Sequence, residues 1–251
     1  MQPTRPIRGM GWVAAGLGAA VFPASARAAA PISPGGLTIP GLTGVSLPWT
    51  IVVLLTVLTL LPALLLAMTP FVRILVVFHF LRQALGTQST PTNQTLIGLA
   101  LFLTYFVMQP VGADVYRTAI VPLESNHVTA MEALERASVP LRHFMLKFTR
   151  QKDLALFVEL ANDPRPRRPE DLSMRVVIPA YILSELKAGF QIGTVLFFPF
   201  LVIDLVVASV TTSVGMLQLP PVVISTPLKI LLFVMVDGWN LVVGSLMKSF
   251  Y

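Results

Sequence analysis

Ionisable side chains within apolar sequence are the residues of this chain best suited to chemistry. Asp204 lies in the run LFFPFLVIDLVVASVTT and is the only charged residue between Lys187 and Lys229. Asp237 interrupts a second apolar run. An ionised carboxylate in hydrocarbon costs roughly 3 kcal/mol or more. Each aspartate is therefore expected either to pair with a cation such as Lys229 or Arg73, or to face a wet path as an ion site, proton relay or pore wall.

The residue patterns of common enzymes are missing from the sequence. The three histidines, His79, His127 and His143, lack His-Glu-x-x-His spacing, and the chain has no cysteine, so a zinc site is not indicated. No glycine-rich phosphate loop is present, and the segment VGSL lacks the second glycine of a nucleophile elbow. We predict a protein that is not an enzyme and has no catalytic residue, cofactor or metal. A membrane-held enzyme that uses His127 and His143 is the weakest alternative.

The composition is that of a membrane protein. The 251 residues have a mean hydropathy of +0.76, and only 12% are charged, against about a quarter in soluble domains. The formal net charge is +6, but three of the arginines lie in an apparent leader. No basic stripe alternates with aromatic residues, so nucleic acid is not an expected partner.

Residues 1–28 have the three parts of a secretory signal peptide. A basic start precedes the apolar core Met10 to Phe22, which is too short to span a bilayer, and the small-residue tail PASARAAA follows. Cleavage after Ala26 and cleavage after Ala28 both satisfy the small-x-small rule. A first anchor helix that is never cut is the alternative.

The rest of the chain divides into four segments by composition. Residues 29–46 are rich in Pro and Gly and predict a flexible arm. Residues 47–113 predict an N-terminal hydrophobic helical hairpin. Residues 114–175 hold 19 of the 30 charged residues and predict a charged helical segment on the periplasmic side. Residues 176–251 predict hydrophobic helices with a pore loop at 213–221.

Prolines and small residues indicate how the helices are built. A proline frees a backbone carbonyl that hydrocarbon cannot satisfy, so a proline-rich apolar sequence suits broken helices packed in protein. The predicted fold class is therefore all-α, with broken or kinked hydrophobic helices of the integral-membrane type. Gly189 and Gly193, four residues apart, would let two helices approach closely. The prolines concerned are Pro179, Pro199, Pro220, Pro221 and Pro227.

Polar residues near the charged segment predict local features. Thr129 and Glu132 form a capping box that is expected to begin a helix. Gly86 is expected to end the apolar helix that contains Arg73, His79 and Arg82. Glu185 and Lys187 lie close enough to the charged segment for a salt bridge at the membrane edge to account for them.

Four long blocks carry a family resemblance that runs from about Leu60 to the end of the chain. They are TPFVRILVVFHFLRQALGTQSTPTNQTLIGLALFLTYFVMQPV, LRHFMLKFTRQKDLALFVELA, PAYILSELKAGFQIGTVLFFPFLVIDLVVAS and TPLKILLFVMVDGWNLVVGSL. These blocks resemble the FliP family of flagellar type III export-gate proteins, with the injectisome SctR proteins as more distant relatives. The resemblance implies a ring-shaped helical pentamer with FliQ-like and FliR-like subunits, in the flagellar basal body at the bacterial inner membrane. It further implies that unfolded flagellar subunits cross this gate.

The resemblance also implies roles for individual residues. Phe144, Phe157 and Glu185 match family positions linked to subunit assembly, and Asp204 matches an intramembrane aspartate. For Asp204 we predict an interior position and a role in assembly or conformational change more than in proton transport.

The same resemblance locates a pore gate. Met216 matches the first of a methionine run that seals the pore, so Met216 and Leu217 are predicted to form the gate. Methionine side chains from several copies would make a deformable seal. Here the chain departs from the family pattern, because Leu217 and Gln218 stand where many members continue with methionine.

A proton-coupled membrane transporter is the alternative function. In that case Asp204 and Asp237 would be protonated in turn, and the single chain would work without partners. An export gate would function only within a complex.

Overall fold

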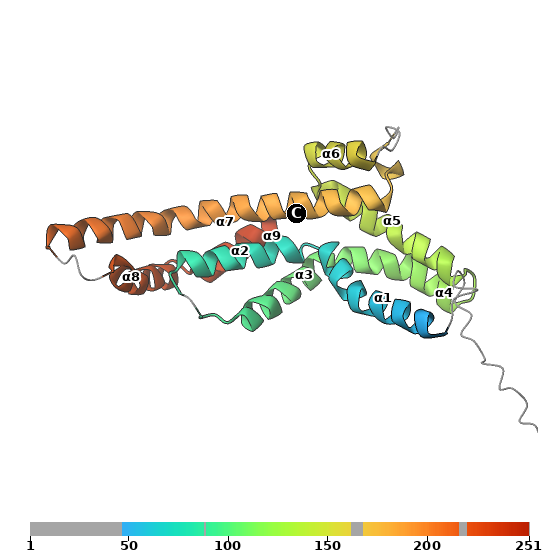
Figure 1. Cartoon of the computed structure of the whole chain (residues 1–251), viewed down its shortest axis with the longest axis horizontal. Coiled ribbons are helices and arrows are strands. Elements are labelled where there is room, and N and C mark those ends of the chain that lie inside the picture. The colour runs from blue at the N-terminus through green and yellow to red at the C-terminus, as the bar shows by residue number, and fades with distance from the viewer. Residues whose placement is uncertain (1–46, 88, 162–167, 216–219, 251) are drawn as a thin grey trace, which may run out of the picture. The chain divides into compact units, whose positions relative to one another are not determined.

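The computed structural model describes residues 47–87, 89–161, 168–215 and 220–250, and every regular element in these ranges is a helix (Figure 1). The predicted all-α class is confirmed. The predicted signal peptide (1–28), the arm (29–46) and the gate residues Met216 and Leu217 lie outside the described residues, so these remain predictions.

The helices follow one another in a simple order. The bounds are α1 (Leu47–Ala67), α2 (Phe71–Ala84), α3 (Asn93–Val115), the π-helical turn η1 (Tyr116–Ile120), α4 (Val121–Glu124), α5 (Ala130–Phe148), α6 (Gln151–Ala161), the 3-10 turn η2 (Pro169–Asp171), α7 (Met174–Ser213), α8 (Pro221–Met235) and α9 (Gly238–Lys248).

The pairing of α2 with α7 forms the centre of the core (Figure 1). The two helices approach closely at the predicted glycines. A Cβ atom on Gly193 would lie 2.5 Å from Cγ of Phe80, and one on Gly189 would lie 3.0 Å from Cγ1 of Val76. The close helix contact predicted from the glycine spacing is therefore present, and it lies within the chain.

Helices α3, α5 and α9 complete this core around the α2–α7 pair. Their buried apolar side chains belong to one cluster, which includes Ile74, Val77 and Phe78 of α2, Leu96 and Ala100 of α3, Phe144 and Met145 of α5, Val176, Val177 and Tyr181 of α7, and Leu246 of α9. Helix α6 packs on α7, and α8 packs on both α7 and α9.

Local sequence signals set several helix ends. Thr129 caps α5, because its hydroxyl oxygen accepts a hydrogen bond from the backbone N–H of Glu132 at 3.3 Å. The carboxylate of Glu132 accepts from Arg136 at 2.7 Å. Helix α2 ends before Gly86, whose φ of +76° is the left-handed conformation that favours glycine.

Broken hydrophobic helices are confirmed, although only some prolines mark a break. Pro70 lies in the bend before α2 and Pro220 precedes α8, whereas other prolines lie inside helices. Helix α7 continues for 40 residues through Pro179 and Pro199, a length of about 60 Å, roughly twice the hydrocarbon core of a bilayer. The sharp bends lie elsewhere. The axis turns by 71° between Ala67 and Phe71, and by 67° between Met235 and Gly238.

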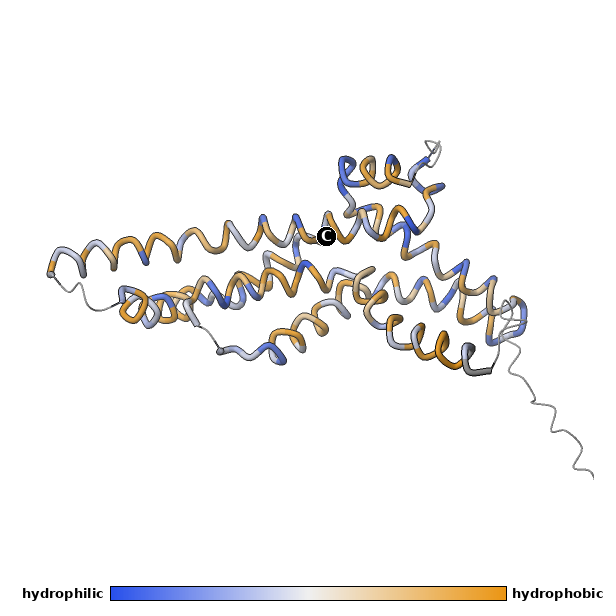
Figure 2. The backbone as a smooth tube through the Cα atoms, in the orientation of Figure 1, coloured by the Kyte–Doolittle hydropathy of each residue, from blue (hydrophilic) through white to orange (hydrophobic). Residues whose placement is uncertain are grey.

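Many large apolar side chains are exposed on these helices, and Figure 2 shows hydrophobic residues along much of their length. Two helical runs in the described ranges, Asn93–Glu124 and Met174–Ser213, are long and apolar enough to cross a membrane, and the number rises to four if each bent pair is one span. In α1, Trp49, Leu58 and Leu64 are all exposed. A helix that is apolar on all sides requires lipid or other protein around it.

The close contact at Gly193 gives a first prediction. Gly193→Ala is expected to lower the free energy of unfolding by about 2 kcal/mol, because the new methyl group would overlap the base and ring of Phe80. Gly98→Ala in α3 is the matched control, since no heavy atom lies within 4 Å of its added Cβ. Thermal unfolding of the detergent-solubilised chain measures both. Equal midpoints for the two variants would contradict the tight α2–α7 contact.

Candidate functional site

Asp204 of α7 is held by two side chains of α8. Nζ of Lys229 lies 2.5 Å from Oδ2 of Asp204, and the Ser225 hydroxyl donates a hydrogen bond to Oδ1 at 2.6 Å. The Lys229 side chain is only 3% exposed, whereas that of Asp204 is 35% exposed. Of the two environments left open by the sequence, Asp204 therefore has the ion pair with Lys229, and it is half-buried in the isolated chain.

This ion pair connects the two helices on either side of the predicted pore loop. Asp204 lies nine residues before Ser213, where α7 ends, and Lys229 lies eight residues after Pro221, where α8 begins. The ion pair therefore holds these two consecutive helices together. Because Lys229 is the more deeply buried partner, its ammonium group depends on Asp204 for compensation.

Asp237 has a different environment. It lies at the bend between α8 and α9 with a φ of +51°, and its side chain is exposed. Its Oδ2 atom accepts a hydrogen bond from Nδ2 of Asn240 at 3.2 Å, and within the described ranges it forms no ion pair. Asp237 therefore lies at an exposed bend between α8 and α9, where it accepts a hydrogen bond from Asn240.

A second ion pair lies in the centre of the core. The guanidinium group of Arg73 on α2 donates to the carboxylate of Glu185 on α7, and both side chains are buried. Arg73 also donates to the hydroxyl of Ser249 at 3.2 Å, and its Cζ atom lies 4.2 Å from the ring centre of Phe250. These contacts attach the residues after α9 to the core.

The salt bridge expected near the charged segment is formed by Lys187 and not by Glu185. Glu185 is fully buried, and its partner, Arg73, lies 112 residues away. Lys187 pairs instead with Asp153 of α6. The sequence places Glu185 and Lys187 two residues apart, but that spacing puts them on different sides of a helix.

The predicted assembly residues belong to this core. Phe144 is buried, with its ring centre 6.2 Å from that of Tyr181, and Phe157 packs against the same cluster. Phe144 and Glu185 are thus both buried in the isolated subunit. Their roles in assembly remain predictions.

A polar cluster fixes α6 on α7. Asp153 is buried, and it accepts hydrogen bonds from Lys187 and, at 2.8 Å, from the hydroxyl of Ser184. Burial acts to raise the pKa of Asp153, but the hydrogen bonds from Lys187 and Ser184 and the positive charges of Lys187 and Arg150 outweigh it, so the pKa lies below its usual range. Asp153 was not singled out from the sequence, where it is one of many charges in a polar segment.

The histidines do not form a site together. His79 contacts Arg82 at 3.3 Å, His127 contacts the hydroxyl of Ser125 at 2.7 Å, and His143 is exposed on α5. Among the residues that the structure describes, there is no group of three His, Cys, Asp or Glu side chains that could hold a metal ion.

The unequal burial of Asp204 and Lys229 leads to a prediction of unequal effects. Asp204→Asn should lower the free energy of unfolding by about 3 kcal/mol, because it leaves the buried Lys229 ammonium without a counter-charge. Lys229→Met should cost less, since the half-exposed carboxylate can be hydrated. The double variant should be more stable than Asp204→Asn alone, which a double-mutant cycle of thermal unfolding would measure. Additive effects would show that the two groups do not interact.

The Asp153 cluster predicts a pH dependence. A lowered pKa in the folded state means that the contribution of Asp153 to stability is complete above the ordinary aspartate pKa of about 4 and is lost as the pH falls through the folded value. At pH 7 the parent chain should therefore be more stable than Asp153→Asn. The difference in melting temperature should shrink between about pH 5 and pH 3.

The control for this measurement is Glu159→Gln, which removes an exposed carboxylate from the same helix. It should change the melting temperature little at any pH. If the curves for the parent chain and Asp153→Asn stay parallel down to pH 3, the Asp153 ion pair does not stabilise α6.

Comparisons with known proteins agree with the resemblance of the sequence blocks. A model of the FliP family matches residues 54–246. The flagellar biosynthetic protein FliP of Pectobacterium carotovorum subsp. carotovorum is 52% identical over 222 residues, which cover 85% of this chain and 86% of that protein. That of Bacillus subtilis (strain 168) is 52% identical over 200 residues, with coverages of 80% and 90%. That of Caulobacter vibrioides is 48% identical over 238 residues, with coverages of 95% and 89%. This chain, with its Asp204–Lys229 and Arg73–Glu185 ion pairs, belongs to the FliP family.

Proposed function

We propose that this chain is a core subunit of the flagellar type III export gate. It assembles as a pentamer with FliQ-like and FliR-like subunits at the inner membrane, within the flagellar basal body. Unfolded flagellar subunits pass through the assembly, and the chain catalyses no bond change. The observation that carries this proposal is the match of residues 54–246 to the FliP family, supported by relatives that bear the name flagellar biosynthetic protein.

The exposed apolar surface supports a role within an assembly. Beyond Gly193, α7 carries a series of exposed hydrophobic side chains, and α8 exposes further ones. Isolated soluble proteins rarely expose so much contiguous apolar area, which is typical of contacts with lipid or other subunits. The exposed residues include Val195, Phe198, Leu201, Val202, Leu205 and Val206 of α7, and Leu228, Leu231 and Val234 of α8.

In this proposal, Asp204 has a structural role next to the gate. Its pairing with Lys229 joins α7 to α8 on both sides of the segment that holds Met216 and Leu217. Methionine and leucine from several copies would close the pore, and the ion pair would hold the two helices that present them. A carboxylate that neutralises a buried lysine is a poor candidate for a freely exchanging proton site.

The alternative of a proton-coupled transporter is not supported. The acids it requires have unrelated environments, because Asp204 compensates Lys229 while Asp237 serves a surface bend. The family to which the chain belongs is one of flagellar biosynthetic proteins.

A comparison of the two aspartates tests the function. In a flagellated bacterium from which the gene for its own FliP family member has been deleted, the parent chain should restore secretion of flagellar subunits. Asp204→Asn should lower secretion at least tenfold, because it disturbs the α7–α8 hairpin, whereas the surface variant Asp237→Asn should secrete at nearly the parent level. Secreted flagellin in the culture medium is the measurement.

Native mass of the detergent-extracted complex provides the second readout. Expression beside the neighbouring flagellar genes should give a ring of several copies that includes two small hydrophobic partners. If the chain stays monomeric and both aspartate variants abolish a proton flux, the transporter is the correct reading and the gate is wrong.

A further inference from the structure

Helix α8 meets α9 at a bend of 67°, where each of two consecutive residues has a special backbone requirement. Asp237 has the left-handed conformation, with φ of +51° and ψ of +50°. The next residue, Gly238, lies against the ring of Phe233, because a Cβ atom on Gly238 would lie 2.2 Å from Cδ2 of that ring. Only glycine therefore allows the backbone to approach the last turn of α8 so closely.

Trp239, which follows this bend, has aromatic contacts with two other helices. Its ring centre lies 5.5 Å from that of Phe233 on α8, with the planes at 83°, and 6.4 Å from that of Phe78 on α2, with the planes at 66°. Aromatic pairs favour such edge-to-face arrangements. Phe78 belongs to the core cluster around α2 and α7, whereas Phe233 belongs to a second cluster with Phe200. The indole ring therefore connects two hydrophobic clusters.

The aromatic contacts continue from α8 to α7 beside the ion pair. The ring centres of Phe233 and Phe200 lie 6.3 Å apart. Phe200 and Asp204 are four residues apart on α7, and therefore lie on one face of that helix. Lys229 and Phe233 have the same spacing on α8. A shift of α8 at Phe233 would thus be felt at the Asp204–Lys229 pair, one helical turn away.

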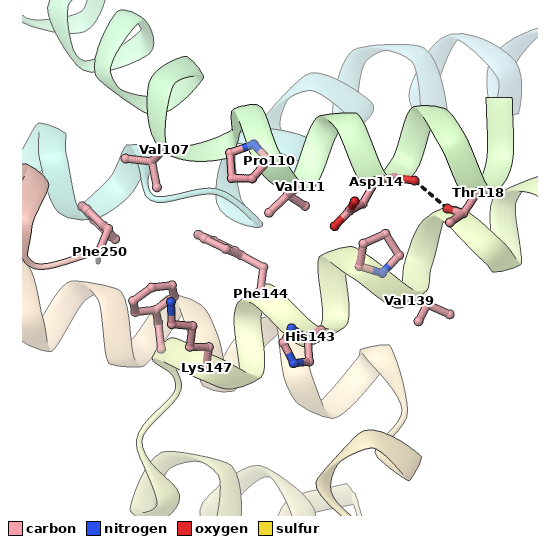
Figure 3. Close-up of a pocket in the computed structure, with 12 residues that line it drawn as sticks. Val107, Pro110, Val111, Asp114, Thr118, Val139, His143, Phe144, Lys147 and Phe250 are labelled. Carbon is pink, nitrogen blue, oxygen red and sulfur yellow. Dashed lines mark hydrogen bonds between the residues drawn. The ribbon is translucent and has the colours of Figure 1, made fainter. Parts of the chain in front are cut away.

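The far end of α9 is fixed to the core. Leu246 is buried in the core cluster. Phe250, which follows the helix, lines one pocket with Phe144 and Phe148 (Figure 3), and its ring centre lies 5.6 Å from that of Phe148. Because α9 is held at this end, the bend at Asp237 and the contacts of Trp239 determine the direction of α8.

From these contacts we propose that Trp239 is a positioning residue for the export function. Its ring contacts Phe78 and Phe233 together, sets the angle between α9 and α8, and so holds Lys229 against Asp204. Without the indole ring, α8 would pivot at the bend and carry Lys229 with it. This inference rests on the proposed function and adds to it a residue outside the ion pair.

The angle between α8 and α9 can be measured directly, because the chain has no cysteine. Val223→Cys and Lys248→Cys place two spin labels on exposed residues near the outer ends of α8 and α9. Pulsed electron paramagnetic resonance of the detergent-solubilised chain should give one narrow distance distribution. Trp239→Leu should at least double its width, because leucine has no ring to contact Phe78 and Phe233. Trp239→Phe keeps a ring and should keep the width of the parent.

Matched variants separate this effect from a general loss of packing. Trp49→Leu removes an exposed tryptophan of α1 and should leave the distribution unchanged. Gly238→Ala should broaden it, because the new methyl group displaces the Phe233 ring, whereas Gly244→Ala in the same helix has no heavy atom within 4 Å of its added Cβ and should not. Gly238→Ala also provides the test if Trp239→Leu does not fold. Thermal unfolding establishes which variants are folded.

Secretion of flagellin in the deletion strain connects the angle to the function. Trp239→Leu should lower secretion roughly fivefold or more, the scale of one lost aromatic contact, while the variant still folds and assembles as the parent does. Trp239→Phe should restore secretion close to the parent level. Loss of secretion with unchanged assembly is the result that a purely structural role would not give.

Two results would overturn the proposal. One is an unchanged distance distribution in both Trp239→Leu and Gly238→Ala. The other is secretion at the parent level by a variant whose distribution has broadened. Failure of the parent chain itself to restore secretion would instead overturn the proposed export function, and the distance measurement would still show whether Trp239 sets the angle between α8 and α9.

Discussion

The fold depends on one helix contact, the register of α2 against α7. Gly189 and Gly193 let the helices approach until Val76 and Phe80 fill the space above them, and the Arg73–Glu185 pair lies on the same contact. A buried ion pair contributes little net stability, yet any other register would leave two charges unpaired in the core. The α2–α7 helix pair is then surrounded by helices α3, α5, α6 and α9. The contact thus selects one arrangement among apolar helices that could pack in many ways.

Much of this architecture could be predicted from local sequence, while the two prolines inside α7 misled. Composition predicts an all-α membrane protein. The spacing of Gly189 and Gly193 predicts the close helix contact, and Gly86 predicts the end of α2. Pro179 and Pro199 do not end α7, because the rest of a long helix and its packing offset the loss of one hydrogen bond. The bend at Asp237 depends on a left-handed conformation at a residue other than glycine, for which the sequence offers no reliable signal.

The ion-pair partners in the candidate site could be predicted only in part from the sequence. Lys229 was one of two cations considered for Asp204, because both lie in apolar sequence. Only the fold decides between them, and it assigns the other cation, Arg73, to Glu185. Partners that lie 112 residues apart carry no spacing that a single sequence could reveal. The burial of Phe144 likewise follows from α5 packing against α7.

The length of α7 has a mechanical meaning. From the glycine contact at Gly193 to Ser213 the helix extends for about 30 Å. A continuous helix of that length can act as a lever on α2 that carries α8 with it, because Phe200 packs with Phe233 and Asp204 pairs with Lys229. A tilt of about 5° at the contact with α2 would displace the Ser213 end by roughly 3 Å. The contact of the Phe80 ring with Gly193 would therefore set the position of the distant end of α7 as well as the packing of the core.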